Sequence, residues 1–444
     1  MSIPVSYWRS VKGAEGIVDA VERAVSDHVA RPGDRLPTVR ELATQLGVAP
    51  NTVAAAYRTL GTRGIVTGRG RQGTRINAGP ALPARPAPII PAGTRDLANG
   101  NPDPALLPSW RAALKRLSPP SVSYSEAQAD DPQLLDLARR QFQADGIDAD
   151  RALVVPGALD GVERVLVAHL RPGDRVAVED PGFARSFDLI SALGLVALPM
   201  EVDDEGPRPE ALQGALADGA HAVLVTPRAQ NPTGAVLTPA RARALRRVLE
   251  PHPDVLVIED DHAGPIAGAT VATLTTAARP RWAVVRSVAK SLGPDLRVAV
   301  LTGDRTTMDR VEGRLRLGTG WVSHLLQALV VDLWSDPRTA AQIEHARATY
   351  SERRTALIDA LAAHGIVAVG ASGLNVWIPV TEEDVTISGL LARGWAVSGG
   401  ERFRLRSGPA VRVTIATLSP IDARRFADDL ADVLRPRRGV GASV

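Results

Sequence analysis

The sequence contains no cysteine and very little lysine. The absence of Cys among 444 residues excludes disulfides, thiolate nucleophiles and Cys-ligated zinc or iron–sulfur sites. The eight His show no pair at a metal-binding spacing, so no metal site is expected. Only Lys12, Lys115 and Lys290 are Lys, and every other basic residue is Arg. A Lys in such a chain is expected where a guanidinium group could not do the same chemistry.

The chain also lacks a long apolar run. No segment approaches the roughly 18 apolar residues that cross a bilayer, and the N-terminus lacks the basic-then-apolar order of a signal peptide. Hydrophobic residues make up 45% and charged residues 23%, as in globular proteins. We therefore expect a cytoplasmic, multidomain protein with no membrane partner.

Positive charge is concentrated at one end of the chain. Residues 1–78 contain 11 Lys and Arg but 6 Asp and Glu, whereas the whole chain carries a net charge of only +3. Residues 79–94 then form a Pro-rich stretch, which is typical of an extended linker. This organisation predicts a nucleic-acid-binding domain over 1–78, a linker over 79–94 and an effector domain over 95–444.

The N-terminal domain has the pattern of a winged helix–turn–helix. Apolar residues at helical spacing predict a helix over 13–30, followed by two helices that start after Thr38 and near Pro50 and meet at Gly47. Two β-type runs around a Gly/Arg turn predict a hairpin over 64–77.

In such a motif the second helix can enter the major groove of double-stranded operator DNA. Asn51 and Thr52 would face the bases, and Thr38 and Arg40 would approach phosphates. Hairpin residues Arg69 and Arg71 would reach an adjacent groove or the backbone. The alternatives are a helical subdomain with a solvated Arg turn and a dinucleotide site at GRGRQG, although no helix follows that run as such a site requires.

The remainder of the chain predicts an α/β fold. Nearly all-apolar strands alternate with helical stretches, which indicates a mostly parallel sheet covered on both faces. A smaller α+β part follows, ending in a strand over 411–418 and a helix. The predicted strands of the sheet span 152–155, 175–180, 195–200, 221–226, 254–260, 282–287 and 297–302.

Lys290 directly follows one of these strands. A desolvated Lys amine can form a Schiff base with an aldehyde, and pyridoxal phosphate is the obvious aldehyde. Ser287 and Arg297 flank this Lys and could bind its phosphate, as could the helix N-terminus in VVPGALDG at 154–161. The carboxylates of IEDDH at 258–262 could pair with the pyridine nitrogen, and Asn231 could donate to the ring oxygen.

Two resemblances follow from these motifs. The run PGDRLPTVRELATQLGVAPNTVAAAYRTLGTRG and the following hairpin resemble the winged helix–turn–helix of GntR-type regulators, which adds Arg35, Tyr57 and Arg58 to the DNA-binding candidates. The segments EDPGF, NPTG, IEDDH and SVAKSLGPDLR resemble, in this order, a fold-type I aminotransferase domain. The two domains joined by a linker resemble the MocR-type regulators.

This resemblance implies a role for each site residue. Lys290 would carry the cofactor as an internal aldimine, Asp260 would pair with the pyridinium nitrogen and Asn231 would hold the ring hydroxyl. Arg412 would clamp the α-carboxylate of an amino-acid effector, and Arg185 would line the pocket. The other expected cofactor contacts are Tyr124 from the second subunit of a homodimer, Gly157, Ala158, Leu159, Phe183, His262, Ser287 and Arg297.

These observations leave three hypotheses. The first is a transcription regulator that senses pyridoxal phosphate, alone or with an amine or amino-acid effector, through Lys290. The second is an active aminotransferase with an appended DNA-binding module. The third is a large domain that only dimerises. The sequence leaves transaminase activity, the operator, the sign of regulation and the effector open.

Overall fold

The computed structural model describes residues 3–8, 11, 13–27, 29–31, 33–62, 65–68, 73–76, 90–117 and 129–435. The chain divides into two compact units, the first built mainly from residues 1–88 with segments 170–176 and 185–197, and the second from residues 89–169, 177–184 and 198–444. Among the described residues, no helix is long and apolar enough to cross a membrane.

The N-terminal unit is three helices and a hairpin. Helices α1 (Gly13–Ser26), α2 (Val39–Leu46) and α3 (Pro50–Thr62) follow a short 3₁₀ turn, η1 (Val5–Trp8), and precede the antiparallel strands β1 (Val66–Gly68) and β2 (Thr74–Ile76). The predicted order of elements is thus confirmed. The core beneath them consists of Ile17, Val18, Val21, Leu42, Val53, Ala56, Leu60, Val66 and Ile76.

The turn between α2 and α3 is set by its caps. Thr38 caps α2 by accepting from the backbone N–H of Glu41, and the Glu41 carboxylate accepts from the N–H of Thr38, which completes a capping box. At the other end Gly47 adopts φ 66°, a left-handed conformation that glycine adopts without strain. Pro50 then occupies the first position of α3, where no backbone donor is needed.

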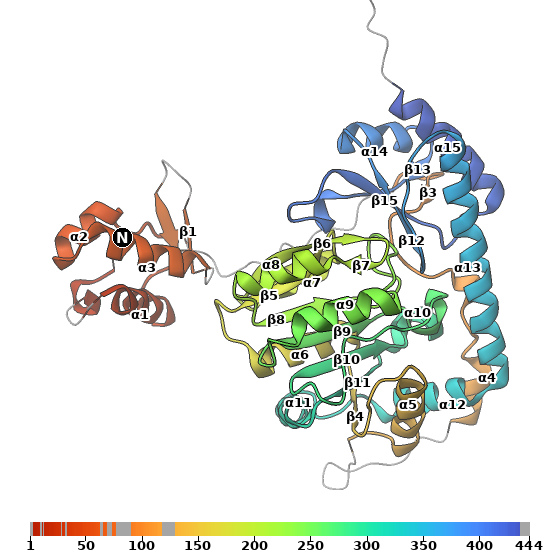
Figure 1. Ribbon diagram of the computed structural model, residues 1–444, viewed down its shortest axis with the longest axis horizontal. Helices are drawn as coiled ribbons and strands as arrows, with labels where there is room; N and C mark the ends of the chain where they lie inside the picture. Colours follow the sequence, from red (N-terminus) through yellow and green to blue (C-terminus); the bar gives the residue numbers. More distant parts are fainter. Residues whose placement is uncertain are drawn as a thin grey trace, which may run out of the picture. The chain divides into compact units, whose positions relative to one another are not determined.

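The second unit is built around an eight-stranded sheet with the order β4-β11-β10-β9-β8-β5-β6-β7. Helix α9 lies over one face of this sheet in Figure 1, whereas α6 contacts β9, β10 and β11. The strands are β4 (Ala152–Val155), β5 (Arg175–Asp180), β6 (Val196–Asp203), β7 (Gly206–Pro207), β8 (Ala222–Val225), β9 (Leu256–Asp261), β10 (Trp282–Ser287) and β11 (Ala299–Gly303).

Strand β11 departs from the parallel arrangement, as does β7, which is antiparallel to β6. Strands β8, β9 and β10 are parallel to one another, but β11 is antiparallel to both of its neighbours, β10 and β4. Only the short helix α10 (Ala289–Leu292) and the turn η5 (Pro294–Leu296) separate β10 from β11. A parallel connection needs a longer crossover, so this connection returns the chain in the opposite direction. The sheet as a whole is mostly parallel, as expected.

The helices of this unit cover the sheet and connect it to the C-terminal part. Helix α13 contains 27 residues, runs along one side of the unit and contacts both α12 and α15 (Figure 1). The helices are α4 (Arg111–Arg116), α5 (Pro132–Ala144), α6 (Ala158–His169), α7 (Ala184–Ala192), α8 (Pro209–Ala217), α9 (Pro239–Leu249), α11 (Arg305–Leu317), α12 (His324–Ser335), α13 (Pro337–Ala363), α14 (Glu383–Leu391) and α15 (Pro420–Leu434).

The C-terminal α+β part has a small sheet of its own. Strands β12 (Asn375–Pro379), β15 (Ala410–Thr414) and β14 (Ser398–Gly399) are antiparallel, and β13 (Trp395–Ala396) pairs in parallel with β3 (Arg95–Asp96). Short 3₁₀ turns η3 (Pro104–Leu106), η4 (Gly264–Ala267) and η6 (Glu401–Phe403) complete the unit.

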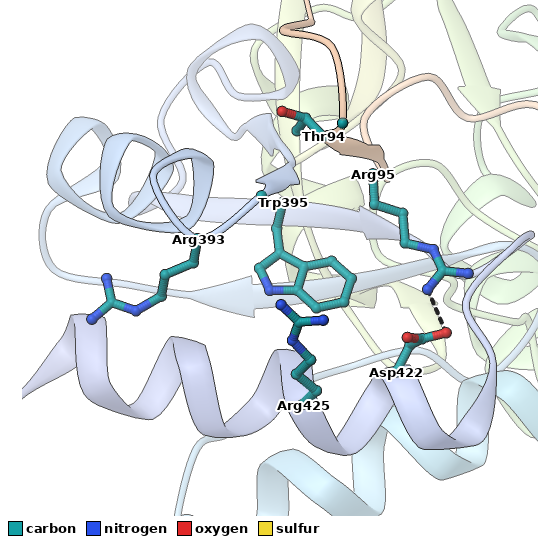
Figure 2. A pocket seen from close by; sticks show the side chains of 8 residues that line it. Thr94, Arg95, Arg393, Trp395, Asp422 and Arg425 are labelled. Atoms are coloured by element: carbon teal, nitrogen blue, oxygen red, sulfur yellow. Dashed lines mark ion pairs between the residues drawn. The ribbon is translucent and has the colours of Figure 1, made fainter.

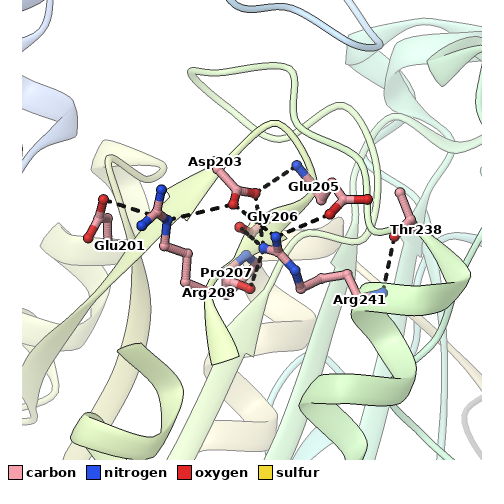
Figure 3. Close-up of polar contacts among 8 residues, drawn as sticks. All are labelled: Glu201, Asp203, Glu205, Gly206, Pro207, Arg208, Thr238 and Arg241. Carbon is pink, nitrogen blue, oxygen red and sulfur yellow. Dashed lines mark hydrogen bonds and ion pairs between the residues drawn. The ribbon is translucent and has the colours of Figure 1, made fainter. Parts of the chain in front are cut away.

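Arg241 links helix α9 to the β6–β7 edge of the large sheet. The Arg241 side chain, 12% exposed, donates both terminal nitrogens to Asp203 at 2.9 and 2.8 Å and one of them to the carbonyls of Gly206 and Pro207 (Figure 3). The backbone N–H of the same residue is capped by Thr238 at 3.1 Å. A planar guanidinium can satisfy several acceptors at once, which explains how one residue joins α9 to the β6–β7 hairpin.

Candidate functional site: a DNA interface and a cofactor pocket

The N-terminal unit exposes most of the residues predicted to contact DNA. Arg40 on α2 and Asn51 and Arg58 on α3 are exposed, and Thr52 is half-buried. Because Asn51 and Thr52 lie in the first turn of α3, they occupy the end of the helix that reads base edges in this motif. Arg69 and Arg71 lie outside the described residues.

Two of the residues predicted to contact DNA, Tyr57 and Thr38, form hydrogen bonds within the unit. Tyr57 is 8% exposed, lies in the hydrophobic core and donates its hydroxyl hydrogen to the Pro37 carbonyl at 2.8 Å. Burial raises the pKa of its hydroxyl, so it remains a donor. Tyr57 therefore holds the segment before α2 against α3, and its contact with DNA stays a prediction. Thr38 is exposed, but its hydroxyl oxygen serves as the cap of α2.

Arg35 lies against the wing. It forms an isolated bridge with Arg75 of β2, and a Cβ atom added to Gly73 would lie 2.9 Å from its Nε. Arg75 in turn donates to the Gly33 carbonyl at 2.8 Å. The exposed Arg35 side chain thus lies against Gly73 and the start of β2.

In the second unit, strand register brings the predicted phosphate ligands together. Ala299 of β11 pairs with both Val155 of β4 and Ser287 of β10. Because β4 and β11 are antiparallel, Gly157, two residues after Val155, meets Arg297, two residues before Ala299. A Cβ added to Gly157 would lie 2.6 Å from an Arg297 terminal nitrogen, so a larger residue here would require the guanidinium to move.

These groups form a site for an anion. Gly157 adopts φ 97° and is followed directly by α6, in whose first turn lie the half-buried Ala158 and Leu159. The free backbone donors of a helix N-terminus beside a guanidinium favour a phosphate. The Ser287 hydroxyl accepts from the N–H of Ala289 at 3.1 Å, and this contact leaves its hydrogen available to another acceptor.

Lys290 follows these ligands in α10. Its half-buried side chain donates from Nζ to the Gly100 carbonyl at 2.6 Å. The segment around Gly100 also contacts Arg412, because a Cβ on Gly100 would lie 3.3 Å from an Arg412 terminal nitrogen and Arg412 donates to the Ala98 carbonyl. Residues 98–100 therefore lie beside both Lys290 and Arg412, a contact that the sequence analysis missed although NGNPD at 99–103 has the composition of a turn.

The consecutive acidic residues Glu259, Asp260 and Asp261 at the end of β9 point to alternate faces of the sheet. Side chains alternate along a strand, so Asp260 points away from Glu259 and Asp261. The Asp260 carboxyl is buried, and its Oδ1 has no hydrogen-bond partner in the described part of the chain. Burial and the neighbouring Asp261 charge raise its pKa to about 7. Burying a carboxyl oxygen without a hydrogen bond costs free energy. A bound group with a donor, which the described residues do not provide, would remove this cost.

Behind Asp260, Asp261 is the centre of a buried ion network. It accepts from Arg228 at 2.8 Å through both carboxylate oxygens and from Arg286 Nε at 2.7 Å, and these charges hold its pKa well below the ordinary range. Arg286 also pairs with Asp145 at 2.6 Å and lies 4.7 Å from the Phe142 ring centroid. This network fixes the end of β9 and was not predicted, because its members are far apart in the sequence.

Asn231 and Arg412 meet from opposite parts of the unit. Arg412 on β15 donates to the Asn231 side-chain oxygen at 3.1 Å, and Asn375 of β12 approaches the same oxygen at 3.4 Å. The Asn231–Pro232 peptide is cis. The contact joins the predicted ring ligand to the predicted carboxylate ligand.

The segment EDPGF is anchored by its aspartate. Asp180, 3% exposed, accepts from the backbone N–H groups of Leu405, Arg406 and Ser407 at 2.9, 2.7 and 3.0 Å. Phe183 follows as a half-buried side chain, and Arg185 is exposed on α7.

His262, directly after β9, has a pKa lowered to about 4 by burial and then by the Lys290 charge, so it is neutral near pH 7. Tyr124 lies outside the described residues.

Two surface cavities lie elsewhere. One of about 440 Å³ surrounds Trp395, with Arg425 beneath the indole and an Arg95–Asp422 ion pair at its side (Figure 2). The other, of about 570 Å³, is lined by residues that include Asp130 and Trp321. Neither cavity includes Lys290.

The fold and this arrangement define a class: an aminotransferase-type α/β unit carried by a chain with a winged helix–turn–helix. Comparison with protein families agrees. Residues 94–430 match the family "Aminotransferase class I and II", and residues 14–76 match "Bacterial regulatory proteins, gntR family". The chain belongs to the MocR-type transcriptional regulators, in which these two domains are joined, and it is a DNA-binding regulator.

Individual relatives support this assignment. The chain is 39% identical over 426 residues to the vitamin B6 salvage pathway transcriptional repressor PtsJ of Salmonella typhimurium, covering 95% of this chain and 99% of that one. It is 29% identical over 460 residues to the regulator TauR of Rhodobacter capsulatus, covering 91% and 93%. A kynurenine aminotransferase of Pyrococcus horikoshii shares the fold, with a TM-score of 0.70 at 19% identity over 77% of this chain and 91% of that one.

Proposed function

We propose that this regulator binds pyridoxal phosphate in its second unit and that the bound cofactor controls its affinity for operator DNA. The observation that carries the proposal is the buried Oδ1 of Asp260, which has no hydrogen-bond partner among the described residues. Asp260 lies at the end of a strand that neighbours the strand leading to Lys290. A protonated pyridine nitrogen would supply the missing donor. The raised pKa of Asp260, about 7, would then fall once a positive partner is present.

Each remaining group has a role in this proposal. Arg297, Ser287 and the N–H groups following Gly157 would bind the phosphate, and Asn231 would donate to the ring hydroxyl. When bound, pyridoxal phosphate supplies an aldehyde that condenses reversibly with a primary amine. Lys290 offers that amine. His262 beside it is neutral, which avoids a second positive charge next to the Lys290 amine.

The similarity to PtsJ extends the proposal to the regulated genes. That relative is named as a transcriptional repressor of vitamin B6 salvage, and the alignment covers almost the whole of both chains. We infer that this chain, acting as a homodimer, represses genes of the same class in response to pyridoxal phosphate. An amine or amino-acid effector bound at Arg412 would modulate the response.

The cofactor is tested by the absorption spectrum of the purified protein before and after borohydride reduction, followed by peptide mapping. We expect a visible absorption band that borohydride reduction removes, as expected for a bound pyridoxal group, and we expect peptide mapping to find the label at Lys290. Lys290→Ala abolishes the label, whereas Lys115→Ala, at an exposed position of α4, retains it. A labelled Lys115, or no label in the wild type, would exclude the proposed site.

Regulation is tested with an operator selected from random duplexes. We expect pyridoxal phosphate to change the operator affinity of the wild type and of Lys115→Ala but not that of Lys290→Ala. If the wild type carries the label at Lys290 but pyridoxal phosphate does not change its operator affinity, the protein binds the cofactor without being regulated by it.

Transamination is the second candidate, and the contact between Arg412 and Asn231 favours it, because it places the proposed ligand of a substrate carboxylate next to the proposed ligand of the cofactor ring. Multiple turnovers of keto acid from an amino acid would establish it. A single turnover, or none, would leave sensing as the function of the pocket.

A further inference from the structure

A series of side-chain hydrogen bonds leads from the small C-terminal sheet to Asn231. Asn375 of β12 pairs with Thr414 of the antiparallel strand β15. Because alternate residues of a strand share a face, Arg412 and Thr414 lie on the same side of β15. All three polar side chains are buried, with Asn375 7%, Thr414 3% and Arg412 5% exposed. This face of the small sheet therefore brings three buried polar groups close to Asn231.

Arg412 determines the direction of every bond in this series. A guanidinium can only donate, so the Asn231 atom that lies 3.1 Å from it is the oxygen Oδ1. Asn375 approaches the same oxygen at 3.4 Å, so it presents its amide nitrogen to Asn231. The Asn375 oxygen then faces Thr414, whose hydroxyl donates to it at 3.0 Å. With Oδ1 of Asn231 facing two donors, Nδ2 is the atom of this amide that can donate to a ligand.

The backbone before β12 holds Asn375 against the turn at 229–234. The Ser372 hydroxyl accepts from the N–H of Ala229 at 2.7 Å, and the Ser372 N–H donates to the Gly234 carbonyl at 2.9 Å. A Cβ added to Gly234 would lie 3.0 Å from the Asn375 carbonyl oxygen, so the two segments are in close contact. These contacts fix the distance between Asn375 and Asn231, although the contact between the two amides is itself long.

We infer that Asn375, held by Thr414, is a positioning residue for the cofactor: it orients the Asn231 amide with its nitrogen toward the ring oxygen. The inference rests on the proposed function, in which Asn231 donates to that oxygen. An amide has a donor on one side and an acceptor on the other, so only partners that distinguish the two define its orientation. Arg412 is one such partner, but it is also the proposed ligand of an effector carboxylate. Asn375 supplies a second donor, which keeps the Asn231 amide oriented when Arg412 binds an effector.

The experiment is a pH titration of the visible band of the full chain loaded with pyridoxal phosphate. The band changes when the proton shared by the Schiff-base nitrogen and the ring oxygen is lost. A donor to the ring oxygen stabilises the anionic form of that oxygen and so lowers the midpoint of the titration. We expect Asn231→Ala, which removes the donor, to raise the midpoint by about 1 pH unit. Asn375→Ala, which removes an orienting partner of that donor, should raise it by about 0.5 pH unit.

Thr414 offers a matched pair of variants. Thr414→Val keeps the shape of the side chain but removes the hydroxyl that donates to Asn375, so it should also raise the midpoint. Thr414→Ser keeps the hydroxyl and should retain the wild-type midpoint. The control is Thr386→Val, which removes a buried hydroxyl on α14 that donates to the Glu382 carbonyl at 2.7 Å and should leave the midpoint unchanged. An equal rise in this control would show that the midpoint reports loosening of the unit, which overturns the inference.

A double variant separates positioning from a direct effect on the cofactor. If Asn375 acts through Asn231, Asn375→Ala should add nothing to the midpoint of Asn231→Ala. The charged and titratable groups proposed for the pocket are the same in all these variants: Asp260, His262, Lys290, Arg297 and Arg412. An unchanged midpoint in Asn375→Ala, or a further rise in the double variant, overturns the inference while the label at Lys290 stays intact. A wild type without the label overturns the proposed function itself.

Discussion

The two units of this chain place their functional groups in opposite environments. The N-terminal unit exposes Arg40, Asn51 and Arg58 on short helices whose core is apolar. The second unit buries Asp260 and Asp261 on β9 and Arg412 on β15. Surface groups contribute to binding with little influence on folding, whereas buried charges must be compensated by partners or ligand. Function and stability are therefore separable in the first unit and coupled in the second.

The sharpest test of this contrast is Asp261→Ala. The change leaves Arg228, 7% exposed, without its carboxylate and deprives Arg286 of one of two partners. Removing one member of a buried ion pair typically costs 3–5 kcal/mol, so we expect a loss of about that size in the free energy of unfolding of the second unit. Urea unfolding monitored by intrinsic fluorescence measures it.

Asp254→Ala is the control for this experiment. Asp254 also pairs with an arginine, Arg281 at 3.4 Å, but its side chain is 88% exposed. The expected loss is under about 1 kcal/mol. Similar losses in the two variants would mean that burial of the pair does not decide its importance, and the contrast between the units would fail.

The second test concerns pH. Burial raises the pKa values of Glu179, Glu259 and Asp260 to about 7, so the folded state binds these protons more tightly than the unfolded chain does. Their contribution to stability is full below the ordinary carboxyl pKa, near 4, and is lost as the pH rises to about 7. We expect the unfolding free energy of the cofactor-free protein to decrease over this range.

Asp260→Asn isolates one of the three groups. Asp260→Asn should reduce the slope of the unfolding free energy against pH by up to about 1.4 kcal/mol per pH unit, which is the value for one proton. Urea unfolding at pH 5, 6 and 7 provides the slope, and Asp254→Asn should leave it unchanged. An identical slope in Asp260→Asn would show that this carboxyl is already ionised in the folded protein.

The same contrast explains which features could be predicted from the sequence. Helix α2 was predictable because its cap, its apolar spacing and Gly47 are all local signals. Strands β4, β5 and β10 were predicted with the bounds they have, because all-apolar runs mark buried strands. The resemblance predicted that Lys290 and Asp260 share a pocket, and the strands that lead to them, β10 and β9, are parallel neighbours.

Other features depend on partners distant in sequence and could not be predicted. Nothing near Asp180 indicates that it holds residues 405–407, and nothing near Asp261 identifies Arg228 and Arg286 as its partners. Tyr57 is a similar case: its position in the motif was visible in the sequence, but its burial and its hydrogen bond to the Pro37 carbonyl were not. Tertiary packing decides these roles.

A smaller effect is expected at the cap of α2. Thr38→Ala removes the side-chain acceptor of the Glu41 N–H and half of the capping box, which typically costs about 1 kcal/mol. Hydrogen exchange of the α2 amides in the full chain should accelerate by about fivefold, the factor corresponding to that energy. Thr59→Ala, an exposed position on α3, should leave α2 unaffected. Equal acceleration in both variants would indicate a general loosening of the unit.

The smallest change in stability, and the clearest separation from function, is expected for Arg40→Ala. Arg40 is exposed on α2, so its replacement should change the unfolding free energy by less than about 0.5 kcal/mol. If its guanidinium neutralises one phosphate, the plot of log affinity against log salt should lose about 0.9 from its slope, whatever the DNA sequence. The wild-type slope should be about −4 to −5 if the unit contacts about five phosphates.

Asn51→Ala provides the counterpart. Loss of an amide that contacts a base should weaken operator binding without altering the salt slope. An unchanged salt slope in Arg40→Ala would show that Arg40 does not contact a phosphate. A large loss of unfolding free energy in Arg40→Ala would show that the first unit, like the second, couples its functional groups to its stability.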